Sequence, residues 1–454
     1  MDNILNYILN DLGAHIFLPI VMLTVGLIVK MKFKDAFSSA LTLGVAFIGM
    51  GTVIGFMFNS IGPASESLVR NTGIALNAID TGWSPASTIA WAWPYAFFLF
   101  PIQILINIIM LAFNKTDTLN VDLWNVWGKV FTAALVSSLT GSIYIALVIA
   151  GIQVVLELKM CDLTQKSVQE VTHIPGVGCS HSMLLSMVIL YPIDLLLRKI
   201  PIMNKKMDAE ILRDKIGIFA ENHVMGFVIG VLIGFSSGYN FSKSLTLGVQ
   251  AGTALVLFPM VAKLFMQALS PISEAASEYM KNKFPDRNFN IGLDWPIMAG
   301  SSEIWVTAIV LVPITLVFAV ILPKNTVLPF GGIINIGLAV SVMILSRGNL
   351  IRMFTLGVIS VPLYLYSATY FAPIITKLAS NINTITIPQN QLITWSSIET
   401  PVLRWIFVQT GQIVQGKFIG IIILVIWGIL YLFFSKEMKQ RNIELQKKFN
   451  GEDV

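Results

Sequence analysis

The sequence predicts an all-α protein that crosses a membrane about eleven times. Of its 454 residues, 55% are hydrophobic and only 12% are charged, and the mean hydropathy is +0.75. A soluble domain carries roughly 25% charged residues. The apolar residues form runs of about 18 or more, such as the one containing GIIILVIWGILYLFF, which match the thickness of a bilayer core. The predicted spans are centred near residues 24, 50, 100, 143, 189, 227, 256, 310, 337, 361 and 426.

Basic residues are concentrated in alternate connecting segments. KMKFK follows the first predicted span, RKIPIMNKKMDAEILRDK follows the fifth, and KEMKQRNIELQKK follows the last. Because Lys and Arg gather in cytoplasmic loops, this pattern favours an outer N-terminus and a cytoplasmic C-terminus. KEMKQRNIELQKK is then expected to form a solvated cytoplasmic helix.

A duplicated motif indicates an internal repeat. LTLGV occurs at residues 41–45 and again at 245–249. Further matches follow in the same order: Glu66 with Glu274, Trp83 with Trp295, and Pro101 with Pro313. Each copy holds five predicted spans, and an odd number turns the second copy upside down in the membrane. Two inverted repeats of this kind are typical of transporters that work by alternating access.

The repeat divides the chain into four parts. The first repeat is predicted over 1–215 and the second over 216–375. An outer segment and the eleventh span follow over 376–435, and the cytoplasmic tail covers 436–454.

Each repeat contains a long interrupted segment after its second span. The first holds AIDTGWSPAS and the second holds NIGLDWPIMAGSSE. Paired broken segments point to a substrate site, because unwound backbone exposes N–H and C=O groups. Asp80, Thr81 and Asp294 there offer hydrogen bonds to a sugar or polyol, and the adjacent tryptophans offer an apolar face. The alternative is that both aspartates only cap helices.

Four further residues are candidates for substrate contact. Glu303, at the start of a predicted span, is a carboxylate near the membrane interior, where such groups are usually functional. His181 follows a glycine-rich turn, although a lone histidine is more often structural. Gly51 and Thr52 offer a hydroxyl within GMGTVIG, but close helix packing explains that motif equally well.

Several functions are disfavoured by what the sequence lacks. It has no phosphate-binding GxxxxGK[ST] loop and no regular arginine ladder, which argues against nucleotide hydrolysis and voltage sensing. Cys161 and Cys179 have no metal-ligand or redox spacing, so we expect no metal and no cofactor. Both cysteines fall on a segment predicted to lie outside, between the fourth and fifth spans, where free thiols or a disulfide are both open.

Extended stretches of the chain resemble a known family. GPASES, AIDTGWSPASTIAWAWPYA, AENHVMGFVIG and PFGGIINIGLA are similar to the galactitol-type IIC component of the bacterial phosphoenolpyruvate-dependent phosphotransferase system. That family is related to the ascorbate-specific IIC permeases. The resemblance implies a homodimer in the bacterial cytoplasmic membrane, with a dimerising domain and a mobile core that moves substrate like an elevator.

The related permeases also suggest site residues. An Asp-Thr step and a later aspartate match Asp80, Thr81 and Asp294, a Gly-Ser resembles the pair at residues 51–52, and a histidine matches His181. The chain departs from the ascorbate group at WGKVFTAA, with Lys129, where that group has a His and a Gln, so this relationship implies the fold but leaves the substrate open.

The resemblance implies transport coupled to phosphorylation. IIC would bind galactitol or a similar polyol outside and move it inward, where a phosphocysteine on a separate IIB protein would phosphorylate it, so the chain would depend on IIB and IIA. The chain would then be part of a phosphotransferase complex without a phosphoryl-carrier residue of its own, surrounded by lipid and with no nucleic-acid partner. The alternative is a proton- or sodium-coupled transporter in which Asp80, Asp294 and Glu303 carry the ion.

Overall fold

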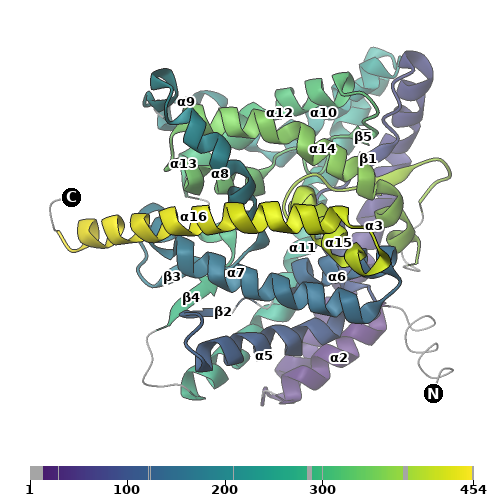
Figure 1. Ribbon diagram of the computed structural model, residues 1–454. Coiled ribbons are helices and arrows are strands. Elements are labelled where there is room, and N and C mark those ends of the chain that lie inside the picture. The colour runs from purple at the N-terminus through teal and green to yellow at the C-terminus, as the bar shows by residue number, and fades with distance from the viewer. Residues whose placement is uncertain are drawn as a thin grey trace.

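The computed structural model describes residues 14–28, 30–120, 122, 124–207, 209–283, 289–298, 300–381 and 387–451 (Figure 1). Six of the described helices are long and apolar enough to cross a bilayer, or seven if a pair bent by 93° is counted as one span. The bent pair consists of α4 (Trp83–Trp91) and the stretch Ala96–Ala112, which ends in α5 (Leu99–Ala112). The prediction of a helical membrane protein is therefore confirmed, while the number eleven stays a prediction.

One predicted span is misplaced. Residue 143, the expected centre of the fourth span, lies at a turn between α6 (Val126–Thr140) and α7 (Ile143–Thr172). Gly141 ends α6 with a φ of 68°, and the Ser142 hydroxyl accepts the Ile145 N–H to cap α7. A left-handed glycine followed by a serine cap is the usual chemistry of such a turn. Two packed helices thus occupy the place of one predicted span.

Four helices form a tightly packed bundle: α2 (Ala14–Ile28), α3 (Phe33–Thr72), α10 (Asn222–Ser236) and α11 (Phe241–Lys283). The two LTLGV copies lie in α3 and α11. A Cβ on Gly44 would lie 2.8 Å from the His15 carbonyl oxygen, and one on Gly252 would lie 2.8 Å from the His223 carbonyl oxygen. These glycines therefore let each long helix approach the helix before it. Close approach of this kind is what glycines allow between packed membrane helices.

Two small parallel sheets organise the rest of the molecule. In one, β1 (Ala78–Asp80) lies between β5 (Val327–Leu328) and β6 (Leu392–Thr394). In the other, β4 (Asn290–Leu293) lies between β2 (Thr118–Asn120) and β3 (Val177–Cys179). The strand pairing satisfies backbone groups that the broken segments would otherwise expose to lipid.

Each central strand belongs to a broken segment, and both of its neighbours come from the other half of the chain. The two halves are therefore interlocked rather than merely adjacent.

The remaining elements surround these sheets. They are η2 (Ala96–Phe98), η3 (Ser182–Leu185), α8 (Ser186–Leu197), η4 (Pro201–Asn204), α9 (Ala209–Ile216), η5 (Gly217–Ala220), η6 (Trp295–Met298), α12 (Ser302–Ile321), α13 (Ile336–Ser346), α14 (Leu350–Ser380), α15 (Pro401–Gly411), η7 (Gln412–Gln415) and α16 (Ile419–Phe449).

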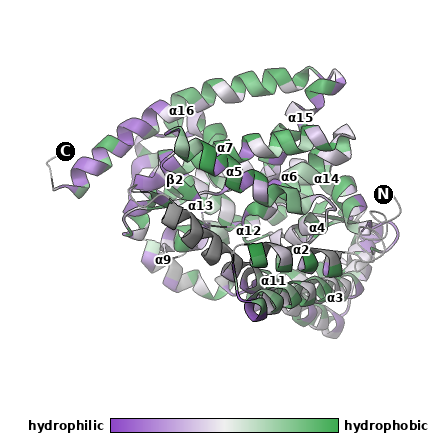
Figure 2. Cartoon of the chain, turned by 90° about the horizontal axis from the view of Figure 1, so that it is seen from below, coloured by the Kyte–Doolittle hydropathy of each residue, from purple (hydrophilic) through white to green (hydrophobic). Residues whose placement is uncertain are grey.

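Helix α16 runs unbroken from the membrane into the C-terminal tail, and Figure 2 shows its colour changing from hydrophobic to hydrophilic towards the C end. The predicted helix over KEMKQRNIELQKK is confirmed. It is not fully solvated, because Arg441 is 2% exposed and donates to the Ile344 carbonyl at 2.7 Å.

The ends of α7 and α16 lie at the same end of the molecule. Lys448 pairs with Glu170 at 2.9 Å, and Asn442 donates to the Leu163 carbonyl at 3.1 Å. The prediction that placed the segment after the fourth span opposite the C-terminus is therefore wrong, because the α6–α7 pair adds a crossing. Cys161 and Cys179 are free and fully buried in this part of the structure.

Candidate functional site

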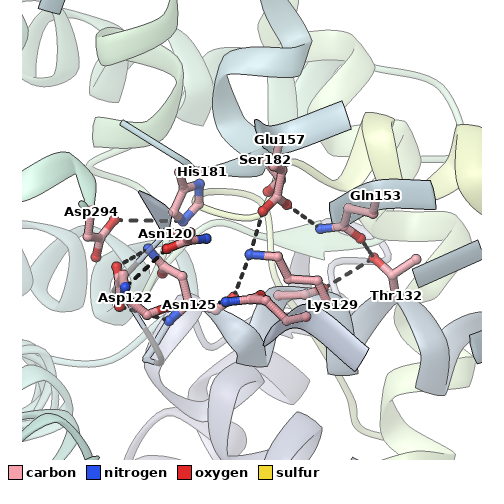
Figure 3. A network of polar contacts seen from close by, with 12 residues as sticks. Asn120, Asp122, Asn125, Lys129, Thr132, Gln153, Glu157, His181, Ser182 and Asp294 are labelled. Carbon is pink, nitrogen blue, oxygen red and sulfur yellow. Dashed lines mark hydrogen bonds and ion pairs between the residues drawn. The ribbon is translucent and has the colours of Figure 1, made fainter. Parts of the chain in front are cut away.

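Three titratable side chains from distant parts of the chain meet in the interior. His181 Nε2 lies 3.3 Å from Glu399 Oε1 and 4.0 Å from Asp294 Oδ1. His181 and Asp294 come together because β3 and β4 are paired, with Cys179 opposite Leu293, so both chains leave the sheet at the same edge. Figure 3 shows the contact between His181 and Asp294. We name His181, Asp294 and Glu399 the central triad.

The hydrogen bonds around His181 define its tautomer. The Met183 N–H donates to Nδ1 at 3.1 Å, so the proton of the neutral imidazole lies on Nε2, which faces Glu399. The imidazole is 1% exposed. Both ring nitrogens are thus engaged, which fixes the orientation of the ring.

Glu399 connects the triad to a second buried pair. Its Oε2 accepts a hydrogen bond from Ser182 Oγ at 2.5 Å and also pairs with Arg404, which is fully buried. Arg404 in turn donates to Ser182 Oγ at 3.3 Å. Glu399 fits against α6 only because Gly128 has no side chain there. A buried ion pair with additional hydrogen bonds holds its members in one geometry.

Sequence reasoning missed Glu399 and Arg404, which it assigned to an outer segment. Both are buried, at 1% and 0% exposure, at the start of α15. The available signal was the pair of opposite charges within SSIETPVLRW, flanked by apolar residues.

A second polar network lies beside the triad (Figure 3). Lys129 forms an ion pair with Glu157 and donates to the Asn125 carbonyl at 3.1 Å. Glu157 accepts from Gln153 at 2.6 Å, and Gln153 accepts from Thr132 at 2.5 Å. Glu157 was also missed, although a carboxylate inside the apolar run IQVVLELK is the signal that singled out Glu303.

The Asp80 carboxylate forms hydrogen bonds within the protein. It accepts from Ser396 Oγ at 2.5 Å and from the Gly82 N–H at 2.9 Å. Thr81 Oγ1 donates to the Thr394 carbonyl at 3.1 Å. These bonds tie the end of β1 to β6, which agrees with a structural role for the carboxylate.

The other candidates lie apart from the central triad. Thr52 is on an exposed face of α3 and donates to the Ile48 carbonyl at 3.0 Å, next to the buried Gly51. Glu303 accepts from Ser301 Oγ at 2.5 Å and lines a separate cavity of about 590 Å³ together with Arg441.

A cavity of about 580 Å³ joins the two broken segments. Thr81 and Trp83 of the first segment and Trp295 of the second line it, together with residues of α11. Ser397 also lines it; this residue is 2% exposed, and its Oγ has no hydrogen-bond partner among the described residues. The cavity borders the triad along the chain, since Trp295 follows Asp294 and Ser397 precedes Glu399 by two positions.

Membrane-crossing helices, interrupted segments and a cavity with hydroxyl and aromatic groups between them define a multi-pass permease. The chain belongs to the EIIC-GAT family, described as the PTS system sugar-specific permease component, whose model matches residues 7–390.

Curated relatives agree with this assignment. The chain is 35% identical over 383 residues to the "PTS system galactitol-specific EIIC component" of Escherichia coli (strain K12), covering 84% of this chain and 85% of the relative. It is 32% identical over 377 residues to a "Putative permease IIC component" of the same organism, covering 82% and 86%.

Proposed function

We propose that this chain is the IIC subunit of a polyol phosphotransferase system and that galactitol or a closely similar polyol is its substrate. One observation carries the proposal: the cavity of about 580 Å³ is shared by both broken segments and presents the buried, unpartnered hydroxyl of Ser397. The galactitol-specific component of Escherichia coli, 35% identical to this chain, supports the same substrate class.

The cavity lining suits a polyol. A hexitol presents hydroxyls on every carbon and C–H bonds between them, so it needs hydrogen-bonding groups and apolar faces together. Ser397, Thr81 and Ser84 supply hydroxyls, and Trp83 and Trp295 supply aromatic surface for the C–H groups. The volume is also within the usual range for small-molecule sites.

The central triad is adjacent to residues that line this cavity. The orientation of His181 is fixed by Met183 and Glu399, and Asp294 is the residue before the cavity-lining Trp295. We infer that the triad holds the second broken segment in its binding geometry and that His181 and Asp294 complete the polyol site.

An elevator-type movement is consistent with how the cavity is built. One wall belongs to α11 of the four-helix bundle, and the other belongs to the broken segments around the two sheets. Movement of the sheet-containing part against the bundle would carry the polyol across the membrane. Because the strand pairings interlock both halves, that part would move as one body, in keeping with two inverted repeats.

We further propose a homodimer with an outer N-terminus and a cytoplasmic C-terminus, working with IIA and IIB. The orientation rests on the exposed lysines at the end of the molecule that holds the C-terminal helix, including Lys205, Lys206, Lys439 and Lys447. The same basic surface is suited to a phosphorylated partner.

The test is uptake of radiolabelled galactitol by cells that express the chain with and without IIA and IIB, followed by chromatography of the internal label. Phosphorylated product that disappears when IIB is omitted supports the proposal. Free galactitol that accumulates without IIB and is lost on addition of a protonophore contradicts it and indicates ion-coupled transport instead.

A further inference from the structure

The cavity carries a lysine on its α11 wall. Lys263 is exposed, lines the cavity and lies within Phe241–Phe265, the part of α11 apolar enough to span a membrane. A neutral polyol does not require a full positive charge there, and ionisable residues within spans are usually functional. Glu221 and Asn222, at the start of α10, line the same cavity.

These charged residues lie at the mouth of the cavity, whereas its hydroxyl groups lie deep inside. The Glu221 side chain is 60% exposed and Lys263 is exposed. Ser397 and Thr81 are only 2% and 1% exposed. A polyol bound to the deep hydroxyls would therefore leave one end directed towards Lys263 and Glu221.

The mouth is on the side of the molecule that holds the C-terminal helix. Asn349 donates to the Lys205 carbonyl at 3.4 Å, and Arg347 pairs with Glu444 of α16 at 3.0 Å. The chain then passes through α9 and η5 to Glu221, and α9 and the C-terminal end of α16 both lie at the left of Figure 1.

The other end of α10 is at the opposite side, where the Ser237 carbonyl accepts from Asn71 at 2.8 Å. In the orientation proposed above, the mouth therefore opens to the cytoplasm, where a phosphoryl donor would arrive.

We propose that the mouth of this cavity is the place of phosphoryl transfer, with Lys263 binding the phosphoryl oxygens and Glu221 accepting the proton. This inference rests on the proposed function. The terminal hydroxyl oxygen of the polyol attacks phosphorus of the IIB phosphocysteine. The new O–P bond forms as the S–P bond breaks, the thiolate leaves on IIB, and the hydroxyl proton passes to the Glu221 carboxylate.

A cation for the phosphoryl group and a carboxylate for the attacking hydroxyl are the two roles that phosphoryl transfer to an alcohol requires. His223 Nδ1 lies 3.6 Å from Glu221 Oε2 and is exposed, so it is placed to relay the accepted proton to solvent.

The first test compares the binding of two ligands, galactitol and a galactitol monophosphate, to purified protein. Lys263→Met should weaken binding of the monophosphate by about tenfold, the scale of a lost charge-assisted hydrogen bond, and leave galactitol binding unchanged. Lys263→Arg should restore most of the loss. Lys243→Met is the matched control, because Lys243 is exposed on the same helix but lies over the Tyr239 ring, 3.8 Å from its centroid.

Equal binding of the monophosphate by wild type and Lys263→Met would overturn the assignment of Lys263. An equal loss of affinity for galactitol and for the monophosphate would also overturn it, because Lys263 would then contact the polyol itself.

The second test measures phosphorylation of galactitol by phosphorylated IIB in inside-out vesicles. Glu221→Gln should lower kcat by about tenfold or more while binding of both ligands stays at the wild-type level. Wild-type kcat in this variant would overturn the proton-acceptor role. Absence of phosphorylation by the wild-type protein would instead defeat the proposed function, so the two failures are distinguishable.

Discussion

His181 Nε2 lies 3.3 Å from Glu399 Oε1. His181 follows a strand of one sheet and Glu399 follows a strand of the other, and most of the second half of the chain lies between them in the sequence. The contact joins the end of β3 to the segment that follows β6. Because Glu399 also binds Ser182 and Arg404, three side chains from these two segments depend on one carboxylate. The contact therefore couples the two sheets next to the proposed polyol site.

The pair of Glu399 and Arg404 should behave as a unit. Arg404→Met leaves the Glu399 charge buried without its cation, which costs about 3–5 kcal/mol, whereas the double variant with Glu399→Gln should recover most of that loss. Thermal unfolding of the purified protein in detergent measures this. Arg347→Met, in a pair whose side chains are 48% and 51% exposed, is the control and should change stability by about 1 kcal/mol or less. A double variant as unstable as the single one would contradict the coupling.

Ser397→Ala should weaken galactitol binding by about tenfold without lowering the unfolding temperature. Its hydroxyl has no partner among the described residues, so the substitution removes a hydrogen bond to the ligand and none within the protein. Isothermal titration with galactitol measures the change.

The neighbouring substitution Ser396→Ala serves as a contrast, since it breaks the 2.5 Å bond to Asp80 and should lower stability. Unchanged galactitol affinity in Ser397→Ala would exclude this hydroxyl from the site.

Gly332→Ala should impair both stability and binding. A Cβ at this position would lie 2.7 Å from Asp80 Oδ2 and 2.9 Å from Ser397 Oγ, so both groups would have to move. Overpacking of this kind typically costs about 1–3 kcal/mol. Unfolding temperature and galactitol affinity should fall together. Gly428→Ala on α16 is the control, because nothing lies within 4 Å of its Cβ position, and it should match the wild type.

Charge reversal at Lys205 and Lys206 should weaken binding of IIB. Both lysines are exposed beside η4, at the end of the molecule where the cavity opens. Like charges would then face the phosphorylated partner, and the affinity should recover partly when salt screens the repulsion. Pull-down or interferometry with phosphorylated IIB measures the effect.

Lys417→Glu, at the start of α16 and thus at the opposite end, should bind IIB normally. Arg213 belongs to the same basic segment of the sequence, but its side chain is outside the described part. Wild-type IIB affinity in the double lysine variant would refute this docking surface.

The sequence alone determined the membrane class and the two broken segments. Hydropathy is a local quantity, so composition and apolar runs were enough to predict a membrane protein. The clustering of polar residues with glycine and proline was enough to predict the broken segments. The duplication of LTLGV was also visible, because a repeated motif is present in the sequence itself.

Only the tertiary structure decided which segments pair across the sheets and hence what surrounds the site. β1 pairs with β6, and that pairing brings Glu399 and Arg404 into the interior from a segment that hydropathy had placed outside. The turn at Gly141 likewise changed which end of the molecule the segment after the fourth predicted span occupies. Backbone groups in a bilayer must find partners within the protein, and for these short strands the partners lie in the other half of the chain, where no local sequence pattern records them.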